Sequence, residues 1–264
     1  MKTGIIGCGN MARAIVAGML KKGFCKPGEV LAADAAPQAA QAFVQDFGVR
    51  RAESNRALCA ESDVLLLAVK PQVYEAVIEE IREACHEGQL IISIAPGKSL
   101  AWLAEKFQAP VGLVRAMPNT PAMVGEGLTA WCCGENVTEG QQKLAQKLLS
   151  SFGRAEAVPE HLMDAVVAVS GSSPAYAFIM VEAMADAAVA QGMPRQQAIA
   201  FAAQALLGSA KMVLETGRHP AELKDMVCSP GGTTIEAVRM LEKTGFRSSL
   251  MEAMDACWKK SKGM

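Results

Sequence analysis

The chain has 264 residues, enough to bury a sizeable core in one large domain or two smaller ones. Its formal net charge of −1 gives no global electrostatic attraction to nucleic acid or to an anionic membrane. No uncharged apolar run approaches the roughly 20 residues of a membrane-spanning helix, and the apolar N-terminal stretch is too short for a signal peptide. We therefore expect a cytoplasmic protein with neither nucleic acid nor membrane as a partner.

The cysteines and histidines do not follow a metal-ligand pattern. The eight cysteines include no C-x-x-C pair, and only Cys132 and Cys133 are close in sequence. The three histidines are scattered along the chain. We expect reduced cysteines that mostly fill the core, and no metal site.

The first half of the chain alternates short apolar runs with amphipathic segments. This alternation is typical of an α/β domain in which helices cover a mainly parallel, doubly wound sheet. The predicted strands are 3–9, 29–34, 63–69, 90–96 and 111–118, extended by 127–133 and 154–158, and the predicted helices are 10–22, 35–47, 72–85 and 98–107.

From about residue 160 the pattern changes to long helical stretches rich in alanine and methionine. They are broken at 170–174 and 192–194, where glycine, serine and proline gather. A helix that is apolar on nearly all sides is buried on nearly all sides, which about a hundred residues cannot achieve alone. We predict a Rossmann-type domain over 1–159 and an all-helical domain over 160–264 that packs against a second copy.

A glycine motif follows the first predicted strand. Gly7-x-Gly9-x-x-Ala12 lies between that strand and a helix, which is the context that dinucleotide binding requires. Gly7 permits a tight turn, Gly9 lets the backbone approach a pyrophosphate, and Ala12 keeps the helix close to the strand. A glycine turn without a ligand is the other interpretation.

Asp34 ends the second predicted strand. An acidic side chain at this position accepts hydrogen bonds from the free ribose hydroxyls of NAD and repels the 2′-phosphate of NADP. No arginine follows until Arg50. The local pattern favours NAD, with a helix N-cap as the other role for Asp34.

Ligands of open α/β sheets bind beyond the carboxyl ends of the strands. Lys70 is expected beside the dinucleotide, although a catalytic base is a second possibility for it. Residues 117–121 have two interpretations: they are part of the same cleft, or they form a rigid turn stiffened by two prolines. The residues predicted to line the cleft are Ala68, Val69, Lys70, Pro71, Ala95 and Asn119.

Residues 228–234, Cys-Ser-Pro-Gly-Gly-Thr-Thr, stand directly ahead of an amphipathic stretch. Hydroxyls, glycines and free backbone N–H groups at a helix N-terminus suit an anion. A loop that only caps the helix is the other interpretation.

The combined motifs resemble pyrroline-5-carboxylate reductase. The resemblance spans essentially the whole chain, and the 223–238 stretch is the most specific part of it. The matching stretches are GCGNMA (7–12), LAVKPQ (67–72), RAMPNTPA (115–122), VSGSSPAYAF (169–178), EAMADAA (182–188), LKDMVCSPGGTTIEAV (223–238) and GFRSSLMEAM (245–254).

This resemblance implies an oxidoreductase that reduces the cyclic imine 1-pyrroline-5-carboxylate to L-proline, the last step of proline biosynthesis, with NADPH or NADH. It implies a Rossmann domain and a helical domain that interlocks with a partner subunit, in a homodimer or a larger assembly of dimers. Ser229, Gly232 and Thr233 would bind the substrate carboxylate, and the Thr234 hydroxyl would meet the ring nitrogen as the catalytic group. Asn10 and Met11 would join the cofactor-binding glycines.

The sequence departs from the family at Asp34. Family members commonly use NADPH and carry small polar or basic residues after the second strand. Asp34 therefore favours NADH, and Asn55, which matches a family position near the adenosine, does not decide between the two cofactors.

Two other functions stay open at this stage. A β-hydroxyacid-type dehydrogenase needs a lysine on a helix of the second domain, and Lys211 or Lys224 would have to supply it; Lys211 is better interpreted as a solvated helix residue. A dinucleotide-binding sensor without turnover is the second possibility, because the fold alone does not establish catalysis.

Overall fold

The computed structural model describes residues 1–263 and divides them into two compact units. Unit 1 comprises Met1–Ser172 together with the described residues from Trp258 on, and unit 2 comprises Ser173–Cys257. The predicted domain division between residues 159 and 160 stays a prediction, because the limits of compact units need not coincide with the limits of domains.

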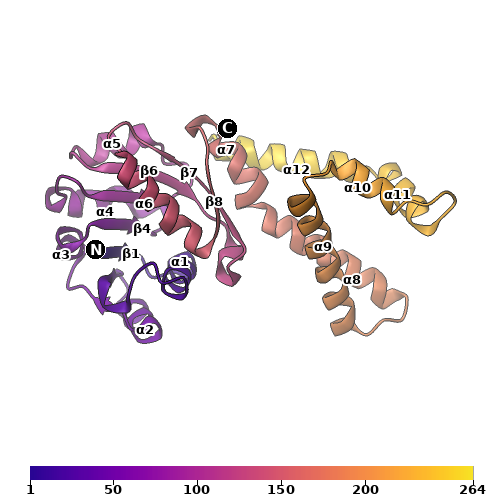
Figure 1. Ribbon diagram of the computed structural model, residues 1–264, viewed down its shortest axis with the longest axis horizontal. Coiled ribbons are helices and arrows are strands. Elements are labelled where there is room, and N and C mark those ends of the chain that lie inside the picture. The colour runs from indigo at the N-terminus through magenta and orange to yellow at the C-terminus, as the bar shows by residue number, and fades with distance from the viewer. Residues whose placement is uncertain (264) are drawn as a thin grey trace. The chain divides into compact units, whose positions relative to one another are not determined.

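Unit 1 is built around one eight-stranded sheet in the order β3-β2-β1-β4-β5-β6-β7-β8 (Figure 1). All neighbouring strands are parallel except β6 and β7, which are antiparallel. The strands are β1 (Thr3–Ile6), β2 (Val30–Ala33), β3 (Arg50–Arg51), β4 (Val64–Leu67), β5 (Leu90–Ser93), β6 (Gly112–Met117), β7 (Gly127–Cys133) and β8 (Gly153–Ala157).

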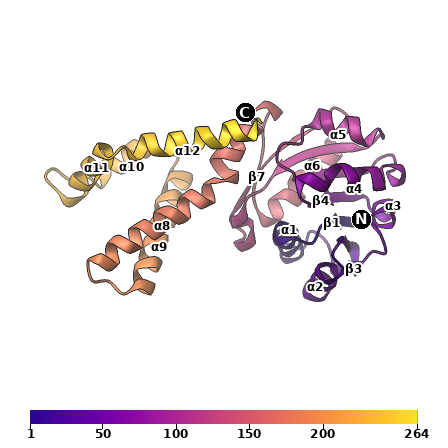
Figure 2. The same ribbon diagram turned by 180° about the vertical axis from the view of Figure 1, so that it is seen from behind.

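Helices cover both faces of this sheet, which confirms the predicted doubly wound α/β architecture (Figures 1 and 2). Alternate strand residues point to opposite faces, so Ile5 joins one core cluster and Ile6 the other. The helices α1 (Asn10–Lys21), α2 (Pro37–Phe47) and α6 (Glu139–Leu149) pack on the first face, and α3 (Asn55–Glu61), α4 (Tyr74–Ile81) and α5 (Leu100–Phe107) pack on the second.

The central strands β4 and β5 are buried on both faces because helices cover both faces of the sheet. In β4, Val64 to Leu67 are each 0% exposed, and β5 is buried along its whole length. Burial of this kind contributes about 25 cal/mol for each Å² of apolar surface removed from water. It also fixes the strand ends, from which the loops of the candidate site start.

Unit 2 is entirely helical, as predicted. Helices α8 and α9 run side by side, joined by a turn at Gly192 (Figures 1 and 2). The helices are α8 (Ser173–Ala190), α9 (Arg195–Thr216), α10 (Pro220–Met226), α11 (Thr233–Lys243) and the first part of α12 (Phe246–Ser261), while the short α7 (Met163–Val166) belongs to unit 1.

Most of the apolar surface of unit 2 is uncovered in the single chain. Phe178, Phe201, Leu214 and Met251 are each more than half exposed, and Ala185 is the one fully buried residue of α8. A solvated monomer would leave this surface in contact with water, which is thermodynamically unfavourable.

Two helical stretches, Glu160–Ala190 and Arg195–Thr216, are long and apolar enough to cross a membrane by length and composition. Both stretches contain charged residues, so the search for uncharged apolar runs in the sequence did not find them. Only 11% of the most apolar window of each stretch is buried. Length and composition alone are weak evidence for a membrane span, and the same exposed surface suits a subunit interface.

Candidate active site

The glycine motif forms a tight loop between β1 and α1. Gly7 has φ +98°, and a Cβ atom there would lie 2.7 Å from the carbonyl oxygen of Ala68, so only glycine fits. The Gly7 N–H donates to the Ala33 carbonyl at 2.8 Å, which ties the loop to the end of β2. The loop is thus held by both strands that neighbour β1.

The N-terminus of α1 is open for an anion. Gly9 is the N-cap, and a Cβ built on it meets no heavy atom of the described chain within 4 Å. The cap supplies no side-chain hydrogen bond, and the first turn contains no acidic residue. The first N–H groups of a helix have no intrahelical acceptor, so they and the helix dipole favour a phosphate here.

The remaining motif residues have distinct environments. Ala12 is 0% exposed and packs in the core, which explains why a small residue is needed at that position. Asn10 is exposed and Met11 is half-buried. Their side chains flank the helix N-terminus where the resemblance placed the cofactor.

Asp34 directly follows β2 and faces the glycine loop. Its Oδ2 accepts a hydrogen bond from the Cys8 N–H at 2.7 Å, and its Oδ1 accepts one from the Ala36 N–H at 2.8 Å. The N-cap of α2 is Ala36, so the N-cap role for Asp34 is wrong. The two backbone donors hold the carboxylate in one orientation, and each oxygen keeps a lone pair for a further donor.

A pocket of about 360 Å³ lies beside Asp34. Asn55 is part of its wall, so the structure brings together these two residues predicted to bind the cofactor. The Asn55 amide donates to Glu80 on α4 at 2.8 Å. Three carboxylates and one guanidinium line this pocket, from Asp34, Glu53, Glu80 and Arg51.

Sequence reasoning missed Glu53, Glu80 and Arg51. Arg51 lies in the two-residue edge strand β3, whose exposed polar residues give no apolar periodicity. Glu80 is an exposed residue of α4 and reaches the pocket only because α3 and α4 pack together. The sequence predicts that Glu80 lies on a helix, but helical spacing does not show which residues of another element that helix packs against.

The loops after β4 and β5 lie at the same sheet edge as the glycine loop. Ala68 and Val69 supply the atoms nearest to a Cβ atom built on Gly7. Lys70 is exposed and Pro71 begins a short 3-10 turn, while Ala95 is buried after β5. This edge is the carboxyl end of the parallel strands, where the fold places ligands.

Asn119 has a structural role in unit 1. Its side-chain amide donates to the Ser170 carbonyl at 3.0 Å, and its Oδ1 accepts from the Leu128 N–H at 2.9 Å. It is 9% exposed. These bonds favour the rigid-turn interpretation of 117–121, and its contact with a cofactor stays a prediction.

The second candidate loop, 229–234, lies in unit 2 at the start of α11. The Gly232 N–H donates to the Ser229 carbonyl at 3.0 Å, which closes a tight turn, and Gly231 has φ +66°. A Cβ on Gly232 would lie 2.4 Å from the Ser229 hydroxyl oxygen. The turn therefore brings the hydroxyl against the Gly232 backbone, and its positive φ favours glycine at position 231.

This loop leaves the N-terminus of α11 without a side-chain cap. Gly232 is the N-cap, and helix formation begins at Thr233. A loop that only caps the helix stays the other interpretation, because glycine is itself a common N-cap residue. Thr233 is exposed and Thr234 is half-buried on the first turn, beside N–H groups that have no intrahelical acceptor.

The described residues, 1–263, contain no group of three or more His, Cys, Asp or Glu side chains able to hold a metal ion. Lys211 forms an exposed ion pair with Glu215 at 3.5 Å, and Lys224 pairs with Asp225 at 2.6 Å. Both lysines thus already have carboxylate partners on the surface of unit 2.

The parallel sheet, the glycine loop and the open helix N-terminus define a Rossmann-type oxidoreductase. Residues 2–97 match the family model "NADP oxidoreductase coenzyme F420-dependent", and residues 160–264 match "Pyrroline-5-carboxylate reductase dimerisation". The chain belongs to the pyrroline-5-carboxylate reductase family.

Similarity to curated relatives and solved structures covers nearly the whole chain. The chain is 48% identical to the Escherichia coli pyrroline-5-carboxylate reductase, covering 98% of this chain and 97% of that one, and 39% identical to the Arabidopsis thaliana enzyme, covering 99% and 94%. The reductase structure from Coxiella burnetii has a TM-score of 0.91 at 33% identity, covering 99% and 97%. The Plasmodium falciparum structure, with NADP bound, has a TM-score of 0.91 at 30% identity, covering 100% and 97%.

Proposed function

We propose that the protein reduces 1-pyrroline-5-carboxylate to L-proline with a reduced nicotinamide dinucleotide, the last step of proline biosynthesis. The uncapped 229–234 turn at the start of α11 supports this most directly, because it offers a carboxylate both hydroxyls and backbone N–H groups. The full-length similarity to pyrroline-5-carboxylate reductases supports the same activity.

The residues of unit 1 fit a dinucleotide. The N-terminus of α1 would bind the pyrophosphate through Gly9, Asn10 and Met11, and Asp34 would meet the adenosine ribose. Ala68 to Pro71 and Ala95 would line the nicotinamide side. When bound, the cofactor supplies a hydride to the substrate.

Asp34 favours NADH over NADPH. Three carboxylates against one guanidinium make the pocket beside Asp34 unfavourable for a 2′-phosphate. The family model named for NADP and the NADP-bound relative support NADPH as a second cofactor. We propose that both are used and that NADH is preferred.

Unit 2 holds the substrate in this proposal. Ser229, Gly232 and Thr233 bind the carboxylate, which places the imine nitrogen at the Thr234 hydroxyl. A cyclic imine can bind already protonated, so its reduction leaves a neutral amine and needs no strong acid from the protein. The protein therefore accelerates the step mainly by aligning the imine carbon with the nicotinamide ring.

The test is loss of reduced-nicotinamide absorbance on addition of pyrroline-5-carboxylate, in parallel with NADH and NADPH. Imine-dependent oxidation with either cofactor supports the proposal, and the ratio of kcat/KM values measures the preference. Folded protein that binds dinucleotide without turnover would instead favour the sensor. The β-hydroxyacid dehydrogenase has less support, because Lys211 and Lys224 are surface ion-pair residues.

We further propose that unit 2 forms a homodimer. The uncovered apolar residues of α8, α9 and α12 support a second copy as their cover, and the dimerisation family model spans this region. None of the eight cysteines, all within the described residues, is in a disulfide. This suits a reducing compartment, and the cytoplasm is the location that we propose.

Size-exclusion chromatography with light scattering at micromolar concentration should give at least twice the mass of one chain, without detergent. Phe178→Glu and Met251→Glu each place a charge on an apolar side chain that is more than half exposed, and should shift the equilibrium toward monomer. Glu156→Lys, on the sheet of unit 1, serves as the charge-changing control. A strict monomer for the unsubstituted chain would contradict the dimer.

A further inference from the structure

Two thiols outside the proposed site lie in contact. Cys59 Sγ on α3 and Cys85 Sγ, just after α4, are 3.7 Å apart. Cys59 is 0% exposed, whereas Cys85 is half-buried, so the pair has one protected and one accessible sulfur. These two sulfurs are separated by little more than their van der Waals contact distance.

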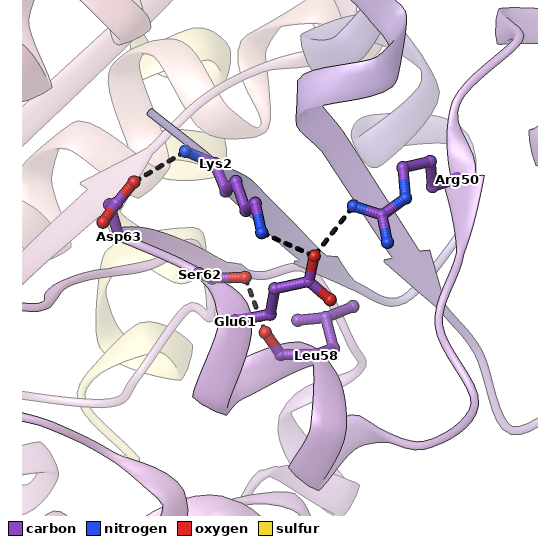
Figure 3. Close-up of polar contacts among 6 residues, drawn as sticks. All are labelled: Lys2, Arg50, Leu58, Glu61, Ser62 and Asp63. Atoms are coloured by element: carbon purple, nitrogen blue, oxygen red, sulfur yellow. Dashed lines mark hydrogen bonds and ion pairs between the residues drawn. The ribbon is translucent and has the colours of Figure 1, made fainter.

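The surroundings hold Cys59 in a defined position. The C-terminal end of α3 is anchored by Glu61, which accepts from Lys2 at 2.7 Å and from Arg50 at 2.8 Å (Figure 3). The Ser62 hydroxyl donates to the Leu58 carbonyl at 2.6 Å in the same turn. Cys59 lies between these anchored residues and cannot easily move away from its neighbour.

Three contacts join α3 to α4 and to the short segment that follows α4. The Asn55 amide donates to Glu80 on α4 at 2.8 Å, the Arg56 guanidinium donates to Glu83 in the 3-10 turn Arg82–Ala84 at 3.2 Å, and Cys59 meets Cys85 directly after that turn. The first contact belongs to the wall of the pocket beside Asp34. A covalent bond at the third contact would therefore link α3, which supplies Asn55 to this wall, to the segment that follows α4.

The local hydrogen bonds differentiate the two sulfurs. The hydrogen bond from Cys85 lowers the pKa of the Cys59 thiol, and the same contact raises the pKa of Cys85. By contrast, burial raises the pKa of Cys132 to about 12, although it too is a core cysteine. The thiolate is the reactive form, so the lowered pKa favours Cys59 as the nucleophile of the pair.

We propose that Cys59 and Cys85 form a reversible oxidation site for hydroperoxides. Cys59 loses its proton to solvent, and its sulfur attacks one peroxide oxygen, so that an S–O bond forms and the O–O bond breaks. The leaving hydroxide takes a proton back from solvent to become water. The Cys85 sulfur then attacks the sulfenic sulfur, which forms the disulfide and releases the second water with the Cys85 proton. Two thiols and one hydrogen peroxide thus give one disulfide and two waters.

Cys85 protects the core in this arrangement. A sulfenic acid on a buried cysteine that finds no second thiol proceeds to the irreversible sulfinic and sulfonic acids. Those charged groups would be buried beside the Gln89 amide oxygen, which lies 3.7 Å from Cys59 Sγ and cannot donate a hydrogen bond to them. Disulfide formation with Cys85 stops the oxidation at a stage that thiols can reverse.

The first test treats the reduced, full-length protein with hydrogen peroxide, alkylates the remaining thiols and maps the linked peptides by mass spectrometry. Cys59–Cys85 should be the main linked pair, because the two sulfurs are already in contact and the pKa of Cys59 is lowered. The partly exposed thiols Cys133 and Cys228 serve as the comparison in the same sample, because they show how far exposure alone leads to oxidation. Linkage elsewhere, or Cys59 still free once these two are oxidised, would overturn the proposal.

The second test compares thermal unfolding before and after peroxide. The linked protein should melt several degrees higher, because the bond restricts the unfolded chain, and dithiothreitol should reverse the gain. Cys85→Ala should instead show an irreversible fall in melting temperature after peroxide, with sulfonic acid at Cys59. Cys132→Ala is the matched control and should behave as the unsubstituted protein; equal behaviour of the two variants would refute a role for Cys85.

Discussion

Replacing Asp34 by serine is expected to shift cofactor selectivity toward NADPH, raising the ratio of its kcat/KM to that of NADH by roughly 10- to 100-fold. The Asp34 carboxylate is held toward the glycine loop by the Cys8 and Ala36 N–H groups. Two unit charges about 4 Å apart interact by about 4 kcal/mol at a surface-like dielectric of roughly 20. Solvent screening reduces this repulsion to the few kcal/mol that such a shift represents.

The gain with NADPH should depend on Arg51. Its guanidinium is the one positive group among the residues that line the pocket, and it could pair with a 2′-phosphate once the carboxylate is removed. The double variant Asp34→Ser/Arg51→Gln should therefore lose most of the gain, while Arg51→Gln alone has little effect with NADH.

Glu135→Gln is the control, because it removes an equal charge from a residue outside the pocket. It should leave the selectivity ratio unchanged. An unchanged ratio in Asp34→Ser, in a protein that melts normally, would show that the carboxylate does not face the ribose.

The central strands were predictable because burial on both faces leaves a simple signal. The run from Val64 to Leu67 is continuously apolar and short, which separates a covered strand from a helix. The antiparallel pairing of β6 with β7 was not predictable in this way. The direction in which two strands pair depends on the connection between them, which here contains the 3-10 turn Thr120–Val124. The alternation of side chains along a strand is the same for parallel and antiparallel pairing, so it does not show the direction.

The missed helices are either mostly polar or short. Helix α6 is mostly polar and has only three buried residues, although its capping box between Thr138 and Gln141 was visible in the sequence. Helix α3 has seven residues and two buried ones. Both are stabilised by packing on the sheet rather than by their own pattern.

The candidate site was predictable where backbone conformation limits residue choice. Gly7 is required because a side chain would collide with the Ala68 backbone, and Gly231 is favoured because its φ is positive; such positions stand out in a sequence. The carboxylates Glu53 and Glu80 were not predictable, since they meet only through the packing of α3 against α4. The Cys59–Cys85 contact depends on the packing of α3 against the segment that follows α4, and was hidden for the same reason.

Replacing Thr234 by alanine is expected to lower kcat by on the order of 10²-fold. In the proposed mechanism its hydroxyl orients the imine nitrogen, so loss of the hydroxyl disturbs alignment in the transition state. Dinucleotide affinity, measured by fluorescence titration, should change less than about twofold because the cofactor contacts proposed for unit 1 are intact. Thr234→Ser keeps the hydroxyl and should recover most of the rate.

Two further variants separate this role from a structural one. Thr233→Ala should mainly raise the KM for the imine, since Thr233 is assigned to the carboxylate, whereas Thr234→Ala should mainly lower kcat. Thr244→Ala removes the hydroxyl that donates to the Met240 carbonyl at the other end of α11, and so controls for damage to the helix. If Thr244→Ala lowered kcat as much as Thr234→Ala did, or if Thr234→Ala left kcat unaltered, Thr234 would have no specific part in the reaction.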